Sequence, residues 1–280
     1  MNKMVVRIIT GAVALVIFVP VLFFSHTVVF DLAIAFLSVM GTVELLRCMN
    51  VANKYIITVP SVFVACFIPL LYRYVITEVI VLIVVGYLFY LLYAAVFTRK
   101  HTSANDIALC FFATVYVTIS FTSILITRSL EYGEILYLMI FIGAWSSDTF
   151  AYFVGNLFGR HKLIPDVSAN KTIEGSVGGI VFCALAFMLY GFIIGRLNRF
   201  DAEPYYIILA CAGVVTSVIA QLGDLSASAI KRNYGVKDYG SIFPGHGGIL
   251  DRFDSVMAVA PVIMIIASVF LKSEQYGLFV

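Results

Sequence analysis

The side chains best suited to chemistry gather in two polar segments of the carboxy-terminal half, and the denser segment spans residues 221–255. If the helix before Asp224 continues, Asp224, Ser228 and Lys231 or Arg232 fall on one face by i, i+4 and i+7 spacing. Asp251 and Asp254 share a face at i, i+3 spacing at the start of the next helix. The spacing therefore predicts that three carboxylates converge at one membrane surface.

Clustered carboxylates repel one another unless a cation lies among them. Hard oxygen ligands select Mg²⁺, which usually keeps waters and completes its shell with substrate phosphates. We predict a metal–phosphate site with Mg²⁺ on Asp224, Asp251 and Asp254, and leave a second cation open. The alternative, a solvated loop that attracts anionic headgroups, explains the cations but not the aspartates. The residues that would neutralise phosphate charge are Lys231, Arg232, Lys237 and Arg252.

A glycine-rich loop, Pro244-Gly-His-Gly-Gly248, lies between the carboxylates of this segment. Its composition excludes a helix interior and allows the backbone amides of Gly247 and Gly248 to approach an anion. His246 is included among the catalytic candidates because an imidazole titrates near neutral pH. It could equally contact a phosphate or shape the loop, since metal-assisted phosphoryl chemistry needs no histidine.

The other polar segment, residues 148–179, begins with an aspartate inside an apolar stretch. Such a residue is expensive in a membrane, so Asp148 is interpreted as functional, and a structural hydrogen bond between helices is the alternative. Further on, Lys171 supplies a cation and Thr172 a hydroxyl just before a glycine-rich helix start, a combination that suits phosphate. The alternative is a helix N-cap with glycine packing. The order of residues does not match a Walker A loop.

Composition indicates what must hold these segments. Apolar residues make up 62% of the 280 positions and charged residues 12%, with a mean hydropathy of +1.03. Soluble domains carry roughly 25% charged residues, so we predict an all-α polytopic membrane protein. A net charge of +2 implies no nucleic-acid partner. The five cysteines lack CxxC spacing and are interpreted as small hydrophobic residues.

About nine transmembrane helices are predicted, because a helix needs about 20 apolar residues to cross the bilayer. The first follows Lys3 and Arg7 and is interpreted as a retained span, since no small-x-small cleavage site follows it. The predicted spans are 5–24, 27–46, 56–72, 75–97, 107–127, 134–155, 176–195, 204–223 and 255–271.

The distribution of basic residues predicts the orientation of these spans. With nine spans, thirteen of the 18 Lys and Arg residues fall on the side of the amino terminus. The positive-inside rule then predicts a cytoplasmic amino terminus, cytoplasmic polar segments and an external carboxy terminus. Residues 1–130 are interpreted as amino-terminal scaffold helices, with possible dimer or lipid contacts, and residues 131–280 as the catalytic region.

The order of these residues resembles a known family. The run Ser228-x-x-Lys-Arg232, Lys237-Asp238 and Pro244-Gly-His-Gly-Gly-x-x-Asp-Arg-x-Asp254 is similar to the motif of bacterial phosphatidate cytidylyltransferases, or CDP-diacylglycerol synthases. Upstream blocks around Ser147-Asp148, Gly159-Arg-His-Lys, Asn170-Lys-Thr and Gln221-Leu-Gly-Asp also match, so the resemblance covers roughly residues 140–260. One departure is Ala169, where the family has proline.

The resemblance implies a reaction at the inner membrane of a bacterium, early in phospholipid biosynthesis. CTP and phosphatidate would give CDP-diacylglycerol and pyrophosphate with Mg²⁺, in a homodimer. The lipid phosphate would be the nucleophile, so no activated side chain is needed. The catalytic set would be Asp224, Lys231, Arg232, Lys237, His246, Asp251 and Asp254, and the substrate-binding set Asp148, Lys171, Thr172, Ser228, Gly247, Gly248 and Arg252.

Three other functions fit parts of the pattern. A CDP-alcohol phosphotransferase would need a paired Asp-Gly and a downstream Asp-x-x-x-Asp, and the spacing of Asp251 and Asp254 differs. A lipid kinase that uses CTP lacks support from the long motif. An ion-coupled transporter would also carry Asp148 and Asp224, but it predicts charges near the membrane midplane and broken helices rather than polar surface connections.

Overall fold

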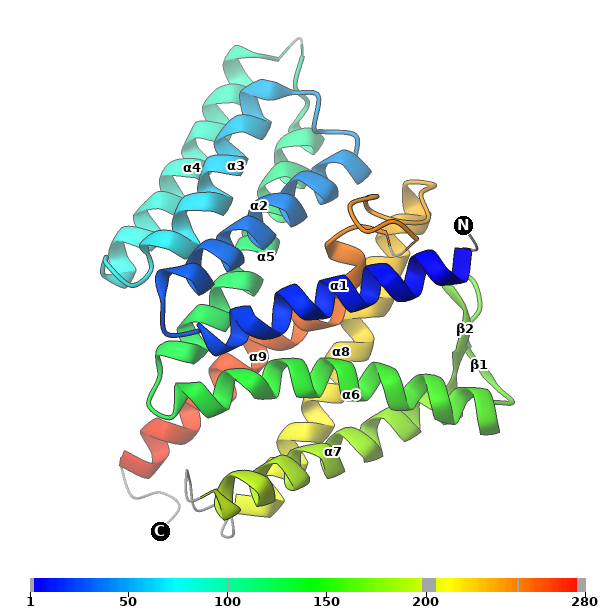
Figure 1. Cartoon of the computed structure of the whole chain (residues 1–280). Helices are drawn as coiled ribbons and strands as arrows, with labels where there is room; N and C mark the ends of the chain where they lie inside the picture. Colours follow the sequence, from blue (N-terminus) through cyan, green and yellow to red (C-terminus); the bar gives the residue numbers. More distant parts are fainter. Residues whose placement is uncertain (1–2, 100, 198–204, 246, 276–280) are drawn as a thin grey trace. The chain divides into compact units, whose positions relative to one another are not determined.

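The computed structural model describes residues 3–99, 101–197, 205–245 and 247–275 (Figure 1). Within these ranges the chain forms nine α-helices and one two-stranded antiparallel sheet. Seven of the helices, α2 and α4 to α9, are long and apolar enough to cross a membrane, and α3 is a shorter apolar helix. In chain order the elements are α1 (Lys3–Phe23), α2 (Val28–Cys48), α3 (Tyr55–Leu71), α4 (Thr77–Phe97), α5 (Ala104–Ser129), α6 (Gly133–Phe158), β1 (Lys162–Ile164), β2 (Ser168–Thr172), α7 (Ile173–Arg196), α8 (Tyr206–Asn233) and α9 (Leu250–Gln275).

Every predicted span coincides with one of these helices, and the main differences lie at the polar segments. Helix α8 continues to Asn233, beyond the predicted end at residue 223, and α9 begins at Leu250 rather than at residue 255. Asp224 and Asp254 therefore lie inside helices. The β1–β2 hairpin is absent from the all-α prediction, because its two strands are short and polar. His246 and the carboxy-terminal residues after 275 lie outside the described residues.

The chain divides into two compact units. The first comprises Met1–Ile126 and Asn233–Phe253, and the second comprises Thr127–Arg232 and Asp254–Val280. The glycine-rich loop therefore packs with the amino-terminal helices, whereas the sequence division at residue 130 groups it with the catalytic region. The hairpin, α6, α7 and the greater part of α8 and α9 belong to the second unit.

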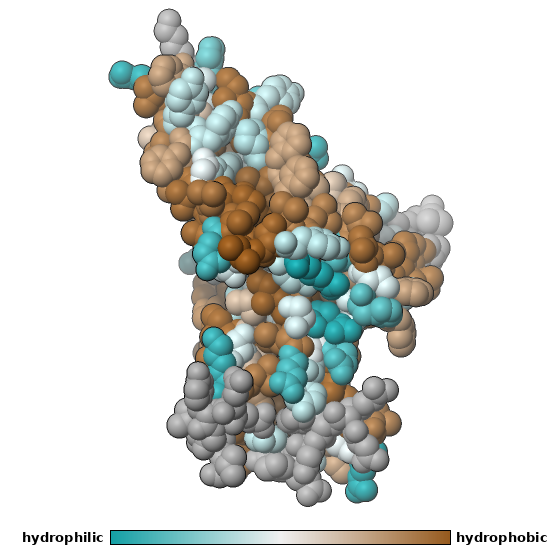
Figure 2. Space-filling model, turned by 90° about the vertical axis from the view of Figure 1, so that its left-hand side faces the viewer, coloured by the Kyte–Doolittle hydropathy of each residue, from teal (hydrophilic) through white to brown (hydrophobic). Residues whose placement is uncertain are grey.

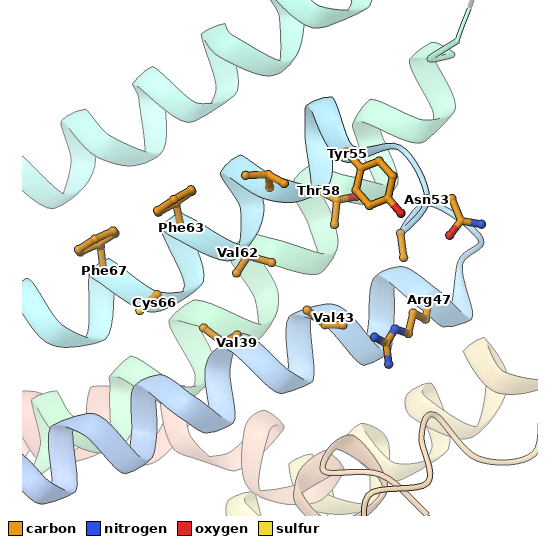
Figure 3. Close-up of a pocket in the computed structure, with 12 residues that line it drawn as sticks. Val39, Val43, Arg47, Asn53, Tyr55, Thr58, Val62, Phe63, Cys66 and Phe67 are labelled. Atoms are coloured by element: carbon orange, nitrogen blue, oxygen red, sulfur yellow. The ribbon is translucent and has the colours of Figure 1, made fainter.

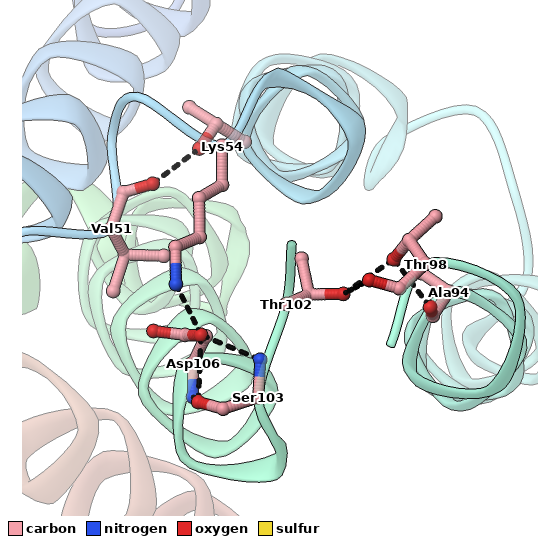
Figure 4. Close-up of polar contacts among 8 residues, drawn as sticks. Val51, Lys54, Ala94, Thr98, Thr102, Ser103 and Asp106 are labelled. Atoms are coloured by element: carbon pink, nitrogen blue, oxygen red, sulfur yellow. Dashed lines mark hydrogen bonds and ion pairs between the residues drawn. The ribbon is translucent and has the colours of Figure 1, made fainter. Parts of the chain in front are cut away.

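In the first unit, polar side chains join the α2–α3 and α4–α5 connections (Figure 4). The Lys54 ammonium forms an ion pair with the Asp106 carboxylate. The same carboxylate accepts hydrogen bonds from the Ser103 amide and hydroxyl, both at 2.7 Å, and the Ser103 hydroxyl accepts from the Asp106 amide at 3.2 Å. This reciprocal pairing caps α5, because it satisfies donors that a helix start leaves without partners.

In the second unit, α6 and α7 run side by side (Figure 1), and small residues let them approach closely. A Cβ atom on Gly178 would lie 2.6 Å from the Cβ of Val154, and one on Gly175 would lie 2.5 Å from the carbonyl oxygen of Ala151. A buried Ser147–Ser217 hydrogen bond of 2.7 Å also joins α6 to α8. Small residues and polar contacts are the usual means of packing helices in a membrane.

The surface agrees with a lipid environment. The face drawn in Figure 2 carries broad hydrophobic areas, with a group of hydrophilic residues among them. Large apolar side chains such as Leu82, Phe89 and Val96 on α4 are more than half exposed. Because exposed apolar patches of this extent are unusual on soluble monomers, the chain is an integral membrane protein.

The α6–α7 packing predicts that glycine is needed at position 178. Gly178→Ala places a methyl group against Val154, and overpacking of this kind costs about 1–3 kcal/mol. Gly86→Ala on α4 is the matched control, because a Cβ at Gly86 would meet nothing within 4 Å. Thermal unfolding of the purified variants should give a lower midpoint for Gly178→Ala alone. Equal midpoints would contradict the close packing.

Candidate active site

An ion pair joins the two polar segments within the second unit. Lys171, at the end of β2, places its ammonium nitrogen 2.5 Å from a carboxylate oxygen of Asp224 on α8. Both side chains are 26% exposed, so the pair is half-buried. A buried charge needs a partner of opposite sign, and each of these residues provides one for the other. An ammonium group has three donors, so Lys171 keeps capacity for an anion.

Two further carboxylates accompany this pair. Asp148 on α6 accepts a hydrogen bond of 2.7 Å from the Ser255 hydroxyl on α9. Asp254, the preceding residue on α9, accepts from the Ser255 amide at 2.9 Å. Asp254 interacts electrostatically with the negative charges of Asp224 and Asp148 and with the positive charge of Lys231. Asp148 interacts in the same way with Asp224 and Lys171. These residues form one polar cluster, which we call the carboxylate cluster: Asp148, Lys171, Asp224, Lys231, Asp254 and Ser255.

Local structure brings α8 and α9 together at this cluster. A Cβ atom on Gly223 would lie 2.4 Å from the Cβ of Ala258 and 3.2 Å from the carbonyl oxygen of Asp254. Glycine at position 223 therefore lets the two helices approach where Asp224 and Asp254 are carried. The continuation of α8 past residue 223 also confirms the condition on which the predicted shared face of Asp224, Ser228 and Lys231 depended.

The β1–β2 hairpin positions Lys171. Thr172 is the N-cap of α7, and its hydroxyl accepts from the Gly175 amide at 3.1 Å. The Glu174 carboxylate accepts from the amides of Arg160 and His161, at 3.1 and 3.2 Å, and pairs with the His161 ring at 2.6 Å. The hairpin is thus fastened to the first turn of α7. Thr172, predicted to bind phosphate, has a structural contact that matches the alternative N-cap interpretation.

The donors of the carboxylate cluster suit a hard cation, because they are carboxylate and hydroxyl oxygens. Among the residues that the structure describes, no group of three or more His, Cys, Asp or Glu side chains is arranged to hold a metal ion. Mg²⁺ is commonly held by one or two carboxylates and by substrate phosphates. The carboxylate oxygens of Asp224 and Asp254 are of the chemical type that Mg²⁺ binds.

Asp251 belongs to the first unit, where its carboxylate organises the glycine-rich loop. One oxygen accepts hydrogen bonds from the Tyr239 amide at 2.8 Å and the Gly248 amide at 2.9 Å. A Cβ atom on Gly247 would lie 2.6 Å from the same oxygen, and Gly247 has a φ of +84°. Both the lack of space and the backbone conformation therefore require glycine at this position. Asp251 is 8% exposed, and these contacts fix the backbone of the loop on both sides of it.

Glu44 is a buried acidic residue that the sequence analysis did not single out. It lies on α2 and is 2% exposed, and its two carboxylate oxygens accept from the Ile249 amide at 3.0 Å and the Leu250 amide at 2.9 Å. It therefore caps the start of α9 from a helix about 200 residues earlier. A Cβ atom on Gly240 or Gly248 would lie within 2.4 Å of a Glu44 oxygen. The sequence feature that could have identified Glu44 is its position as an acidic residue inside an apolar span.

The other predicted residues are distributed over both units. Ser228 is half-buried on α8, and Arg232 is exposed at its end. Lys237 and Arg252 are exposed in the first unit, at the loop and the first turn of α9. Gly247 and Gly248 lie against Asp251 and Glu44, respectively. Their predicted contacts with substrate, and that of His246 outside the described residues, stay predictions.

The chain is similar in sequence to known cytidylyltransferases. Residues 5–270 match the Cytidylyltransferase family. A phosphatidate cytidylyltransferase of Staphylococcus haemolyticus (strain JCSC1435) is 36% identical over 94% of this chain and 98% of its own length. Phosphatidate cytidylyltransferases of Staphylococcus aureus (strain COL) and Staphylococcus epidermidis (strain ATCC 35984) have the same identity and coverage. The similarity therefore extends over both compact units.

The contacts of Glu44 predict a local effect of its removal. Glu44→Ala leaves the Ile249 and Leu250 amides without their acceptors, and a buried donor without a partner costs about 1–3 kcal/mol. Hydrogen exchange of these amides, followed by mass spectrometry, should accelerate roughly tenfold or more. Glu78→Ala, at an exposed position in the first turn of α4, is the control. Unchanged protection of residues 249–250 would refute the capping role.

Proposed function

We propose that this chain, which belongs to the cytidylyltransferase family, transfers the cytidylyl group of CTP to phosphatidate. The products of this reaction are CDP-diacylglycerol and pyrophosphate. The chain is a nucleotidyltransferase of the membrane, and the named activity of its relatives supports this choice of substrates. The structural observation that carries the proposal is the Lys171–Asp224 ion pair. It unites a cation suited to phosphate with a carboxylate suited to Mg²⁺.

The reaction needs little covalent chemistry from the protein. A phosphate oxygen of phosphatidate forms a bond to the α-phosphorus of CTP, and the bond from this phosphorus to the bridging oxygen of pyrophosphate breaks. Since the lipid phosphate is already anionic at neutral pH, the side chains need only orient the reactants and stabilise charge. In the proposed site Lys171 and Lys231 contact phosphate oxygens of the reactants.

The carboxylates complete the proposed site. Asp224 and Asp254 would hold Mg²⁺, which when bound supplies charge neutralisation and a template for the phosphates. Asp148, which accepts a hydrogen bond from Ser255, interacts electrostatically with Asp254. Its negative charge would add to the electrostatic attraction of the site for a cation. The other predicted roles, including Asp251 as a metal ligand and the phosphate contacts of Arg232, Lys237 and Arg252, remain part of the proposal. So does a homodimer.

An ion-coupled transporter is the alternative in which Asp148, Asp224 and Asp254 would serve ion binding, and all three lie inside helices, in α6, α8 and α9. Carboxylates inside membrane helices are common to transporters and enzymes. The choice of an enzyme rests instead on family membership and on the cation–carboxylate composition of the cluster.

The proposed chemistry predicts that the cluster carboxylates are essential. Membranes that contain the chain, supplied with labelled CTP, phosphatidate and Mg²⁺, should release CDP-diacylglycerol and pyrophosphate, and chelation of Mg²⁺ should abolish both. Asp224→Asn and Asp254→Asn should each lower the turnover rate roughly a hundredfold or more, because each removes charge at the reacting phosphates.

Asp166→Asn is the matched control, since this aspartate is exposed in the turn of the β1–β2 hairpin. It should retain the parental rate at equal expression. Full activity of the Asp224 and Asp254 variants would show that the site is elsewhere. Absence of product with every nucleotide and lipid tested would reject the proposed reaction.

We also propose nine membrane spans, with a cytoplasmic amino terminus and active site and an external carboxy terminus. A membrane-impermeant thiol reagent applied to intact cells tests this orientation. Tyr74→Cys, after α3, should react, whereas Asn53→Cys and Asp166→Cys should react only after the membrane is opened. Labelling of residues 53 and 74 from the same side would mean that α3, with 17 residues, does not cross.

A further inference from the structure

We propose that a groove between α2 and α3 binds one anionic phospholipid of the bilayer, with its phosphate at Arg47 and an acyl chain along the valine and phenylalanine side chains. The groove has a volume of about 580 Å³. This lies within the range of roughly 300–1,000 Å³ that is typical of small-molecule sites. All of its lining residues belong to the first unit, so the site is separate from the carboxylate cluster.

The walls of the groove are amphipathic along its length (Figure 3). Val39, Val43 and Arg47 follow one another at i, i+4 spacing on α2 and form a single stripe that lines the groove, with the two valines directed toward α3. Arg47 ends this stripe beside the α2–α3 connection, where Asn53 and Tyr55 complete the polar end. A charged end followed by an apolar channel matches the division of a phospholipid into headgroup and acyl chain.

The polar end carries a positive charge that is available to a ligand. Lys54, the other cation of this connection, is paired with Asp106. Arg47 is exposed, and none of the acidic residues in the described ranges forms an ion pair with it. Glu44, one turn earlier on α2, interacts electrostatically with Arg47, but its carboxylate oxygens are hydrogen-bonded to the amides that start α9. Arginine binds phosphate with paired donors, so a phosphate group complements this end.

The apolar end is built for a hydrocarbon chain. Val62 and Cys66 line it from α3, and the rings of Phe63 and Phe67 lie nearly parallel, with an interplanar angle of 5° and centroids 5.9 Å apart. Phe63 is 55% exposed and Phe67 46% exposed. A free phosphate or nucleotide would leave these surfaces uncovered, whereas a diacyl lipid contacts both ends at once. The positive-inside orientation proposed above would place Arg47 at the leaflet that carries anionic lipids.

Lipid retention by the purified full-length chain tests this site without reference to catalysis. The protein is incubated in detergent with phosphatidylglycerol or, in parallel, with zwitterionic phosphatidylcholine, and bound lipid is counted by native mass spectrometry. One phosphatidylglycerol should be retained in preference to phosphatidylcholine. Arg47→Gln should lower this retention roughly tenfold, as expected for the loss of a charge-assisted hydrogen bond. Arg99→Gln, which removes an exposed charge after α4, should leave it unchanged.

A second variant distinguishes an effect on lipid binding from an effect on folding. Val43→Trp fills the groove but keeps Arg47, so it should also reduce retention while cytidylyl transfer and the unfolding temperature stay near the parental values. Equal retention of both lipids, equal effects of the two arginine variants, or competition by inorganic phosphate alone would overturn the proposal. A dimer that Val43→Trp dissociates would identify a second copy of the chain as the occupant instead.

Discussion

Several acidic residues of this protein lie in helices that are mostly apolar, and each of these carboxylates needs a compensating partner. A carboxylate withdrawn from water is costly unless a cation or several donors accompany it. Asp224 is paired with Lys171, Asp148 accepts a hydroxyl hydrogen bond from Ser255, and Glu44 accepts two backbone amides. These contacts connect elements that are distant in sequence, so the need to compensate charge also determines how the polar segments are arranged.

The remaining structure serves to bring these compensating groups within reach. Gly223 lets α8 approach α9, and the hairpin after α6 carries Lys171 to the start of α7. In the first unit Asp251 binds a backbone amide of the glycine-rich loop, and Glu44 binds the two amides that follow the loop at the start of α9. Glycine is therefore required in both units for the same steric reason, since at each of these places a Cβ atom would collide with a neighbouring side chain.

Much of the fold could be predicted from sequence, because length and hydropathy determine a membrane helix with little help from tertiary contacts. The same rule that singled out Asp148 applies to Glu44, but Glu44 has no motif around it, and its partners lie 205 and 206 residues away. The β1–β2 hairpin was missed because its pairing and its fastening through Glu174 depend on contacts that no local pattern reveals. Spacing did predict the shared face of α8, yet it could not reveal that the Asp251 carboxylate binds loop amides.

The central claim is that Lys171 and Asp224 act as one unit at the reacting phosphates. A double-mutant cycle on kcat/KM for CTP tests it most directly, with Lys171→Met, Asp224→Asn and the double variant compared at equal expression and saturating Mg²⁺. If the two side chains serve one site, the loss in the double variant should be far smaller than the product of the single losses. Losses that multiply independently would contradict this claim, because they would mean that the ion pair joins β2 to α8 but does not act as one unit in the reaction.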